Sequence, residues 1–227
     1  MRLDRLLGRI CGKGRREVRG ILAKGTVEVN GKVILNGRAD VSEFDRLALD
    51  GKVLQDRRAI YVMLNKSAGY LSATVDDEHP TVMELLGDAF EGEDLHIAGR
   101  LDRASTGLLL LTNDGNWSQA LTLPEMEHGK AYLVETAEPI APETAEQFSR
   151  GIYFGYEDIT TGASELEILG AQKARLTIYE GKYHQVKRMF HAVGNRVVSL
   201  HRERVGEIVL DPGLAQGEWR ELREDEV

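Results

Sequence analysis

The sequence predicts an α+β protein in two parts: a small α/β domain over residues 1–58 and a larger domain over 59–227 with a mixed, mostly antiparallel β-sheet. Three observations predict this. Two short amphipathic helical segments precede a strong hairpin signal, Asn30-Gly31. Many short apolar or alternating segments follow, with few helices between them. They lack the regular strand–helix alternation of a parallel sheet.

In the first domain, residues 2–12 and 15–24 carry apolar side chains at helical spacing, with arginines on another side. Gly25 is suited to end the second helix in the left-handed conformation. The segment TVEVNGKV alternates around Asn30-Gly31 and predicts the hairpin. Residues 56–58, Asp-Arg-Arg, predict a linker to the second domain.

In the second domain, short apolar or alternating segments predict strands at residues 60–64, 108–111, 131–134, 152–154, 166–169, 174–179, 197–200 and 205–210. Capping residues and helical spacing predict helices that open near Thr81, Asp114, Pro142 and Tyr183. The run from Leu108 to Leu111 is bounded by Gly and by Asn-Asp-Gly, so we expect a central strand buried on both faces.

Composition restricts the function classes. Apolar residues make up 42% of the 227 residues and charged residues 29%, which is typical of globular proteins. The N-terminal MRLDRLLGRI is unlike a signal peptide and no apolar run could span a membrane, so we expect a cytoplasmic protein without membrane contact. The single cysteine, Cys11, excludes an internal disulfide and a cysteine-based zinc site, and the six scattered histidines predict no metal site.

The net charge of −8 is unevenly distributed. Residues 1–58 carry 14 Lys and Arg against 8 Asp and Glu, whereas the rest of the chain carries 15 against 29. A second basic segment runs from Lys182 to Arg204. A basic module attached to an acidic domain is typical of proteins that bind nucleic acid, with solvated helix faces as the alternative.

The loop before the predicted central strand carries one acid, Asp102, between Arg100 and Arg103. The sequence therefore attaches a carboxylate flanked by cations to the middle of a core. On spacing alone, a turn aspartate that pairs with a neighbouring arginine is the plainer interpretation.

The segment GRREVRGILAKGTVEVNGKV resembles the RNA-binding domain first seen in ribosomal protein S-four. The resemblance implies that the second helix and the start of the hairpin lie on an RNA backbone, through Arg15, Arg16, Arg19 and Lys24. Gly14 departs from that family, which usually has a serine there, and a helix cap is lost.

Three segments of the larger domain resemble pseudouridine synthases of the RsuA type: GRLDRASTGLLLLTNDG, GKAYLVE and EGKYHQVKRMFHAVGNRVVSLHRERVG. With the S-four-like domain, the resemblance covers nearly the whole chain. It implies an isomerase that converts one uridine of 16S rRNA to pseudouridine, the uridine-516 activity of that type, without a cofactor. The expected partner is 16S rRNA or an assembling small ribosomal subunit, and the expected state is a monomer.

The same resemblance implies roles for single residues. Asp102 is the catalytic carboxylate, as a nucleophile or as a base. Lys187 is the cation that pairs with it and keeps it ionised. Arg188 is the second choice for this partner, and a solvated basic face is the alternative for both. Tyr132 stacks on the uracil.

Two further positions complete the expected substrate site. Leu200 forms the pocket floor, and Arg100 helps to extrude the target nucleotide or ties down its own loop. Lys66, followed by Ser67 where the family has proline, is interpreted as an RNA-facing or turn-supporting residue. The sequence does not place three further histidines in the site: His184, His191 and His201.

Two functional alternatives stay open. One is a ribosome-assembly factor that binds rRNA without turnover, and the other is a synthase that acts on large-subunit rRNA. Asp102 with its cation favours an enzyme over a binder, because a binder has no need of that pair. An aspartate-dependent phosphotransferase is disfavoured, because DRAST lacks a second Asp two residues on.

Overall fold

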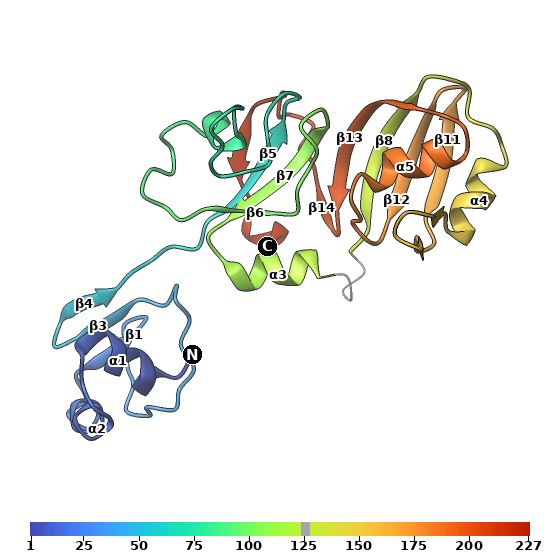
Figure 1. The fold of residues 1–227 in the computed structure, drawn as a ribbon. Coiled ribbons are helices and arrows are strands. Elements are labelled where there is room, and N and C mark those ends of the chain that lie inside the picture. The colour runs from blue at the N-terminus through green and yellow to red at the C-terminus, as the bar shows by residue number, and fades with distance from the viewer. Residues whose placement is uncertain (124–127) are drawn as a thin grey trace. The chain divides into compact units, whose positions relative to one another are not determined.

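The computed structural model describes residues 1–123 and 128–227 and contains two compact units, Met1–Ala59 and Ile60–Val227 (Figure 1). The first unit holds α1 (Leu3–Cys11), α2 (Arg15–Ala23), β1 (Val27–Val29), β2 (Lys32–Val33), β3 (Leu47–Leu49) and β4 (Lys52–Gln55). Its strands form one antiparallel sheet in the order β2-β1-β3-β4. No helix in the described part of the chain is long and apolar enough to cross a membrane.

The predicted hairpin and helix end of the first unit are confirmed. Asn30 and Gly31 have φ values of 51° and 75°, the left-handed pair that a two-residue turn between β1 and β2 requires. Gly25 follows α2 with φ 72° and donates its N–H to the carbonyl of Leu22. The apolar faces of both helices pack with the sheet in one cluster: Leu3, Leu6, Leu7, Val18, Leu22, Val27, Val41 and Leu47. The arginine-bearing sides are left to solvent.

The second unit is built on a single large sheet in the order β11-β12-β8-β13-β7-β5-β15, with β14 paired to β13 and β6 to β7. Its strands are β5 (Tyr61–Lys66), β6 (His96–Ala98), β7 (Thr106–Thr112), β8 (Lys130–Thr136), β11 (Glu165–Gly170), β12 (Lys173–Ile178), β13 (Val197–Val205), β14 (Ile208–Val209) and β15 (Trp219–Glu221). β7 and β13 run parallel, and the other paired strands run antiparallel. The predicted mixed, mostly antiparallel α+β fold is therefore confirmed.

Helices and a small hairpin complete the unit: α3 (Gly115–Thr122), α4 (Thr144–Arg150), α5 (Gln185–Ala192), the 3-10 turns η1 (Val82–Leu85) and η3 (Glu224–Glu226), and the pair β9 (Tyr153–Phe154) and β10 (Ile159–Thr160). Asp114 caps α3 as predicted, because its carboxylate accepts the N–H groups of Asn116 and Trp117. The helix predicted at Thr81 is a single 3-10 turn.

β7 is the central strand that the leucine run predicted. Leu109 and Leu111 belong to the core that contains the α4 and α5 side chains, whereas Leu108 and Leu110 belong to the core that contains α3. All four leucines are fully buried. Alternate side chains of a strand point to opposite faces, so the uninterrupted run fills a core on each side of the sheet.

The prediction of two separate strands at 197–200 and 205–210 was wrong. One strand, β13, runs continuously through Val197–Val205, and β14 is only a short partner. Residues 201–204, which lie between the two predicted strands, belong to β13, and Arg202 in this stretch is only 1% exposed. β13 lies between β8 and β7, so a charged side chain is buried in the middle of the sheet.

Gly107 allows β7 and β13 to approach. A Cβ at this position would lie 2.3 Å from the carbonyl oxygen of Arg202, and its φ of 99° also disfavours any other residue. The loop that carries Asp102 leads directly into this junction, because Arg202 pairs with Gly107 in the parallel register. The position of the loop is thus set by the centre of the sheet.

Candidate active site

A cavity of about 750 Å³ opens in the second unit where the loop before β7 meets the segment before α5. Five residues that the sequence predicted for the site line it: Arg100, Asp102, Tyr132, Lys187 and Leu200. They come from the β7 loop, β8, α5 and β13, so segments up to about a hundred residues apart in the chain meet here.

Asp102 forms the centre of the site. The Nζ of Lys187 lies 2.7 Å from its Oδ2, and the Nε2 of His184 lies 3.3 Å from its Oδ1. Its side chain is 27% exposed, so the carboxylate forms part of the cavity wall rather than a solvated turn. The alternatives from spacing alone, a pairing of Asp102 with a neighbouring arginine and a solvated face for Lys187, do not describe this geometry.

Two buried cations hold the main chain of this loop. The Nζ of Lys66 lies within hydrogen-bond distance of the carbonyl oxygens of Ser67 (3.0 Å), Asp102 (3.2 Å), Arg103 (3.2 Å) and Ser105 (2.8 Å). Lys66 is fully buried, and burial is the main reason why its pKa falls to about 8. Lys66 therefore supports the turn, one of the two interpretations that the sequence left open.

The second cation is Arg202. Its guanidinium donates to the carbonyl oxygens of Leu108 (2.8 Å), Gly99 (3.0 Å) and Arg100 (3.3 Å). Five donors in a rigid fork suit one arginine to several main-chain acceptors at once. The segment from residue 99 to 108, which contains this loop and the start of β7, is thus held by cations that contact its backbone, while its one carboxylate stays at the cavity.

Tyr132 and Leu200 form an apolar part of the wall. They lie on neighbouring strands, where Tyr132 pairs with Arg202 and Leu200 pairs with Val134, and both belong to the same buried cluster. They are 7% and 8% exposed. A flat ring beside an aliphatic side chain suits the two faces of a planar base.

Of the two arginines predicted to bind substrate, the structure brings one to the cavity. Arg100 is exposed and lines the cavity. Arg188 does not line it: its guanidinium pairs with Glu157 and lies 3.9 Å from the centre of the Phe154 ring. One residue further along a helix rotates the side chain by about 100°, so Arg188 holds the β9–β10 hairpin while Lys187 reaches the carboxylate.

Sequence reasoning left His184 out of the site, did not single out Arg202, and named Lys66 without assigning it to the site. His184 contacts the carboxylate, and Lys66 and Arg202 hold its loop. His184 lies three positions before Lys187, just outside α5, and both side chains reach Asp102. Its closeness in sequence to the expected partner of Asp102 was the one signal for it. Nothing in the sequence distinguishes Arg202 from the solvated basic residues around it.

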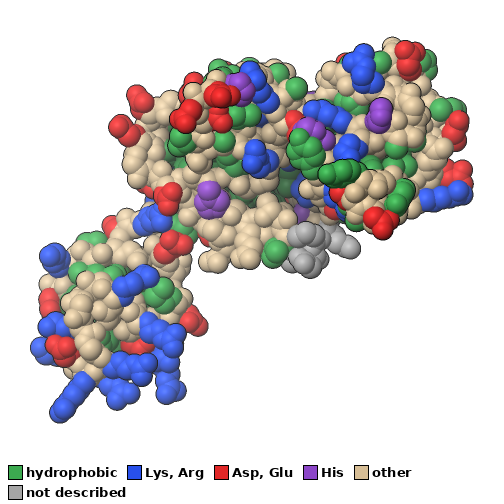
Figure 2. All heavy atoms as spheres, viewed as in Figure 1, with side chains coloured by type: hydrophobic (Ala, Val, Ile, Leu, Met, Phe, Trp, Pro, Cys, Tyr) green, Lys and Arg blue, Asp and Glu red, His purple; other side chains and the backbone are tan. Residues whose placement is uncertain are grey.

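The first unit exposes the basic residues expected to contact RNA. Arg15, Arg16, Arg19 and Lys24 are all exposed, whereas Val18 and Leu22 on the same helix are buried. Figure 2 shows Lys and Arg side chains gathered over the surface of this unit. The S-four-like pattern therefore produces a cationic face.

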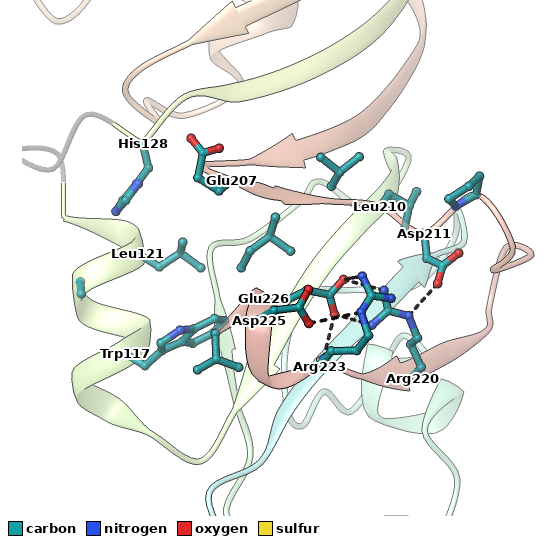
Figure 3. A pocket seen from close by; sticks show the side chains of 15 residues that line it. Trp117, Leu121, His128, Glu207, Leu210, Asp211, Arg220, Arg223, Asp225 and Glu226 are labelled. Atoms are coloured by element: carbon teal, nitrogen blue, oxygen red, sulfur yellow. Dashed lines mark hydrogen bonds and ion pairs between the residues drawn. The ribbon is translucent and has the colours of Figure 1, made fainter.

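A second cavity, of about 660 Å³, lies between α3 and the C-terminal segment (Figure 3). Arg220 pairs with Asp211 and makes two hydrogen bonds to Glu226, at 2.7 and 2.8 Å. Arg223 also pairs with Glu226. These charges satisfy one another, so the cluster fixes the end of the chain. Among residues 1–123 and 128–227, no group of three or more His, Cys, Asp or Glu side chains is arranged to hold a metal ion.

Comparison with known proteins agrees with this site. Residues 60–192 match the family model described as RNA pseudouridylate synthase. The ribosomal small subunit pseudouridine synthase A of Pseudomonas aeruginosa is 47% identical over 228 residues, covering 100% of this chain and 99% of that protein. The protein of the same name from Escherichia coli K12 is 45% identical over 232 residues, covering 100% and 98%.

A solved structure described as a pseudouridylate synthase superposes with a TM-score of 0.72 at 38% identity, covering 100% of this chain and 97% of that one. The family match includes Asp102, Tyr132 and Lys187, and the full-length relatives cover the whole cavity, with Leu200 and Arg202 of β13. The predicted enzyme class is thus confirmed, and a binder without turnover is not supported. The chain belongs to the RNA pseudouridylate synthase family, as a member of its RsuA type.

Proposed function

We propose that this enzyme isomerises one specific uridine of 16S rRNA, in the small ribosomal subunit or its assembly intermediates, with Asp102 as the catalytic carboxylate. The observation that carries the proposal is the ion pair of Asp102 and Lys187 in the wall of a cavity of about 750 Å³. The substrate is taken from the full-length relatives, whose names specify the ribosomal small subunit. The activity on uridine 516 is the most specific form of this proposal.

The reaction balances without an added reactant. The bond from ribose C1′ to N1 of uracil breaks, the base rotates, and a bond from C1′ to C5 forms. The proton leaves C5 and one is taken up at N1, so the product is an isomer of the substrate. A carboxylate at the sugar either attacks C1′ as a nucleophile or removes a ribose proton as a base, and Asp102 suits both.

The other cavity residues support this assignment. Tyr132 offers a buried ring for stacking on an extruded uracil, and Leu200 provides an apolar floor beside it. Arg100, exposed at the cavity, is placed to contact the phosphate backbone or to occupy the space of the extruded base. Lys187 balances the charge of the carboxylate through their ion pair.

The first unit serves as the RNA-binding domain in this proposal. The exposed cations Arg15, Arg16, Arg19 and Lys24 contact phosphates and supply affinity without reading the sequence. We further propose that the enzyme works as a monomer in the bacterial cytoplasm, where 16S rRNA is made. Sedimentation of the purified protein checks the first of these statements.

The Asp102→Asn variant tests the catalytic assignment. Asparagine keeps the shape of the side chain but can neither attack as an anion nor accept a proton, so turnover should be abolished while RNA affinity stays within about twofold of wild type. Tritium release from 16S rRNA transcribed with uridine labelled at C5 measures turnover. A variant that still releases tritium would show that Asp102 is not the reacting group.

Mapping of pseudouridines in rRNA from cells with and without the gene tests the substrate. The proposal expects one position of 16S rRNA to lose its modification. Loss of a site in large-subunit rRNA instead would replace the proposed substrate by the alternative one and leave the enzyme class intact.

Replacement of Arg15, Arg16 and Arg19 by Ala tests the RNA-binding face. Each phosphate contact that is lost should reduce the slope of log affinity against log salt by about 1. Binding of 16S rRNA by the triple variant, measured between low and physiological salt, gives this slope. An unchanged slope would place the RNA elsewhere.

A further inference from the structure

We propose that His184 is a positioning residue for Asp102 and fixes the plane of its carboxylate at the cavity. This inference rests on the proposed role of Asp102 and adds a residue that sequence reasoning left out of the site. Three independent features carry it: the contact of His184 with the carboxylate, its backbone conformation, and the stacking of its ring.

Each oxygen of the Asp102 carboxylate contacts a different side chain. Oδ2 lies 2.7 Å from the Lys187 ammonium, and Oδ1 lies 3.3 Å from Nε2 of His184. An ammonium acts as a point charge and does not determine the rotation of a carboxylate about its Cβ–Cγ bond, which has a broad energy profile. The imidazole that contacts the second oxygen restricts this rotation.

The backbone conformation of His184 is the second feature that points to a functional side chain. His184 begins α5 from a left-handed conformation, with φ 48° and ψ 32°. In the described part of the chain, thirteen glycines and three Asn or Asp residues share a positive φ: Asn30, Asp50 and Asp158. Glycine adopts that conformation freely, whereas for any other residue it is uncommon, although Asn, Asp and His adopt it more often than the rest. A residue kept in a less favourable conformation at a candidate active site indicates a functional side chain.

One face of the His184 ring also has a partner. It stacks on the Tyr183 ring with centroids 3.9 Å apart and an interplanar angle of 21°. The carbonyl of Tyr183 accepts a hydrogen bond from Arg188, and the carbonyl of His184 accepts the N–H of Arg188 in the first turn of α5. Ring and backbone are thus both fixed by the start of α5, the same turn that carries Lys187.

The His184→Gly variant separates a positioning role from a backbone role. Glycine suits the left-handed backbone, so the melting temperature should stay within a few degrees of wild type. Loss of the contact would let the carboxylate turn away from its reactive orientation, so kcat should fall about tenfold while KM stays within about twofold. Single-turnover tritium release and RNA binding are measured on the whole chain with 16S rRNA transcribed with uridine labelled at C5.

Two controls match the change. Asp50→Gly makes the same substitution at nearly the same backbone angle, φ 52°, and does not line the cavity. His191→Gln alters an exposed histidine of α5 that also does not line it. Both should keep the wild-type rate. His184→Asn, which tolerates a positive φ but is too short to reach Asp102, repeats the test if the glycine variant fails to fold.

The outcomes are distinct. A lower kcat at constant KM and melting temperature supports the inference. An unchanged rate overturns it, and so does a rise in KM without a change in kcat, which would make His184 an RNA contact only. Wild type and Asp102→Asn run in parallel: if wild type makes no pseudouridine, or if Asp102→Asn still does, the proposed function fails rather than this inference alone.

Discussion

Replacement of Lys66 by Met should reduce activity far more than stability. The Lys66 ammonium lies within 2.8–3.2 Å of four main-chain carbonyl oxygens, and Met keeps a side chain of similar length without the charge. Two of these carbonyls, of Asp102 and Arg103, also accept a main-chain N–H. For the other two, of Ser67 and Ser105, the ammonium is the donor that the structure shows.

The expected loss of stability follows from two opposing terms. A buried carbonyl left without a donor costs about 1–3 kcal/mol, which gives about 2–6 kcal/mol for the pair. Burial lowers the pKa of Lys66 from 10.5 to about 8, so the charged form is disfavoured at neutral pH by about 3 kcal/mol, a cost that Met does not have. The difference predicts a net destabilisation of about 1 kcal/mol and at most about 3 kcal/mol.

The expected loss of activity follows from the loop that carries Asp102, because three of the four carbonyls that lose their cation belong to this loop. A shift of about 1 Å in a reacting group costs about a hundredfold in rate. Urea denaturation gives the free energy of unfolding, and single-turnover tritium release gives the rate. Lys173→Met, at an exposed lysine of β12, is the control. A rate within twofold of wild type, or a stability loss above about 5 kcal/mol, would refute this reasoning.

Two further predictions concern stability. Gly107→Ala should destabilise the protein by about 3 kcal/mol, because the new Cβ would lie 2.3 Å from the main chain of β13 and φ is 99°. Gly20→Ala, in open space on α2, should instead stabilise the protein by about 0.5–1 kcal/mol. Thermal melting of both variants measures this contrast, and equal effects would contradict it. Hydrogen bonds from Arg220 are the main reason why the pKa of Glu226 falls from 4.5 to about 2, so its contribution to stability is present above pH 4.5 and is lost as the pH falls towards 2. Glu226→Gln should therefore lower the free energy of unfolding by about 1–2 kcal/mol at pH 7 and by almost nothing near pH 2. Urea denaturation of both proteins at several pH values measures this difference. A difference that does not change with pH would disprove the coupling between the ionisation of Glu226 and stability.

Local sequence patterns predicted most helices, strands and turns, because these elements depend on interactions between neighbours in the chain. Asn30-Gly31 predicted a turn that needs two positive φ values, and the structure has both. The leucine run of β7 predicted burial on both faces, because a half-exposed strand alternates apolar with polar residues. Asp114 predicted the start of α3 by its ability to accept main-chain N–H groups.

The strand β13 shows where such patterns fail. Periodicity assigns a charged stretch to the surface, and a buried arginine is stable only where several acceptors converge on it. The acceptors of Arg202 are the carbonyls of Gly99, Arg100 and Leu108, about a hundred positions away in the chain. No local pattern in the sequence reports that convergence.

The sequence by itself determined the fold class, most of the elements and, through long motifs, the family to which the chain belongs. The sequence resemblance offered Lys187 first and Arg188 second as the partner of Asp102. Only the tertiary structure decided how the basic side chains are distributed: Lys187 and His184 at the carboxylate, Lys66 and Arg202 beneath its loop, and Arg188 at another part of the surface. The reason is physical. A strand or turn is selected by interactions within a few residues, whereas the role of a charged side chain depends on the acceptors that the folded chain brings to its end.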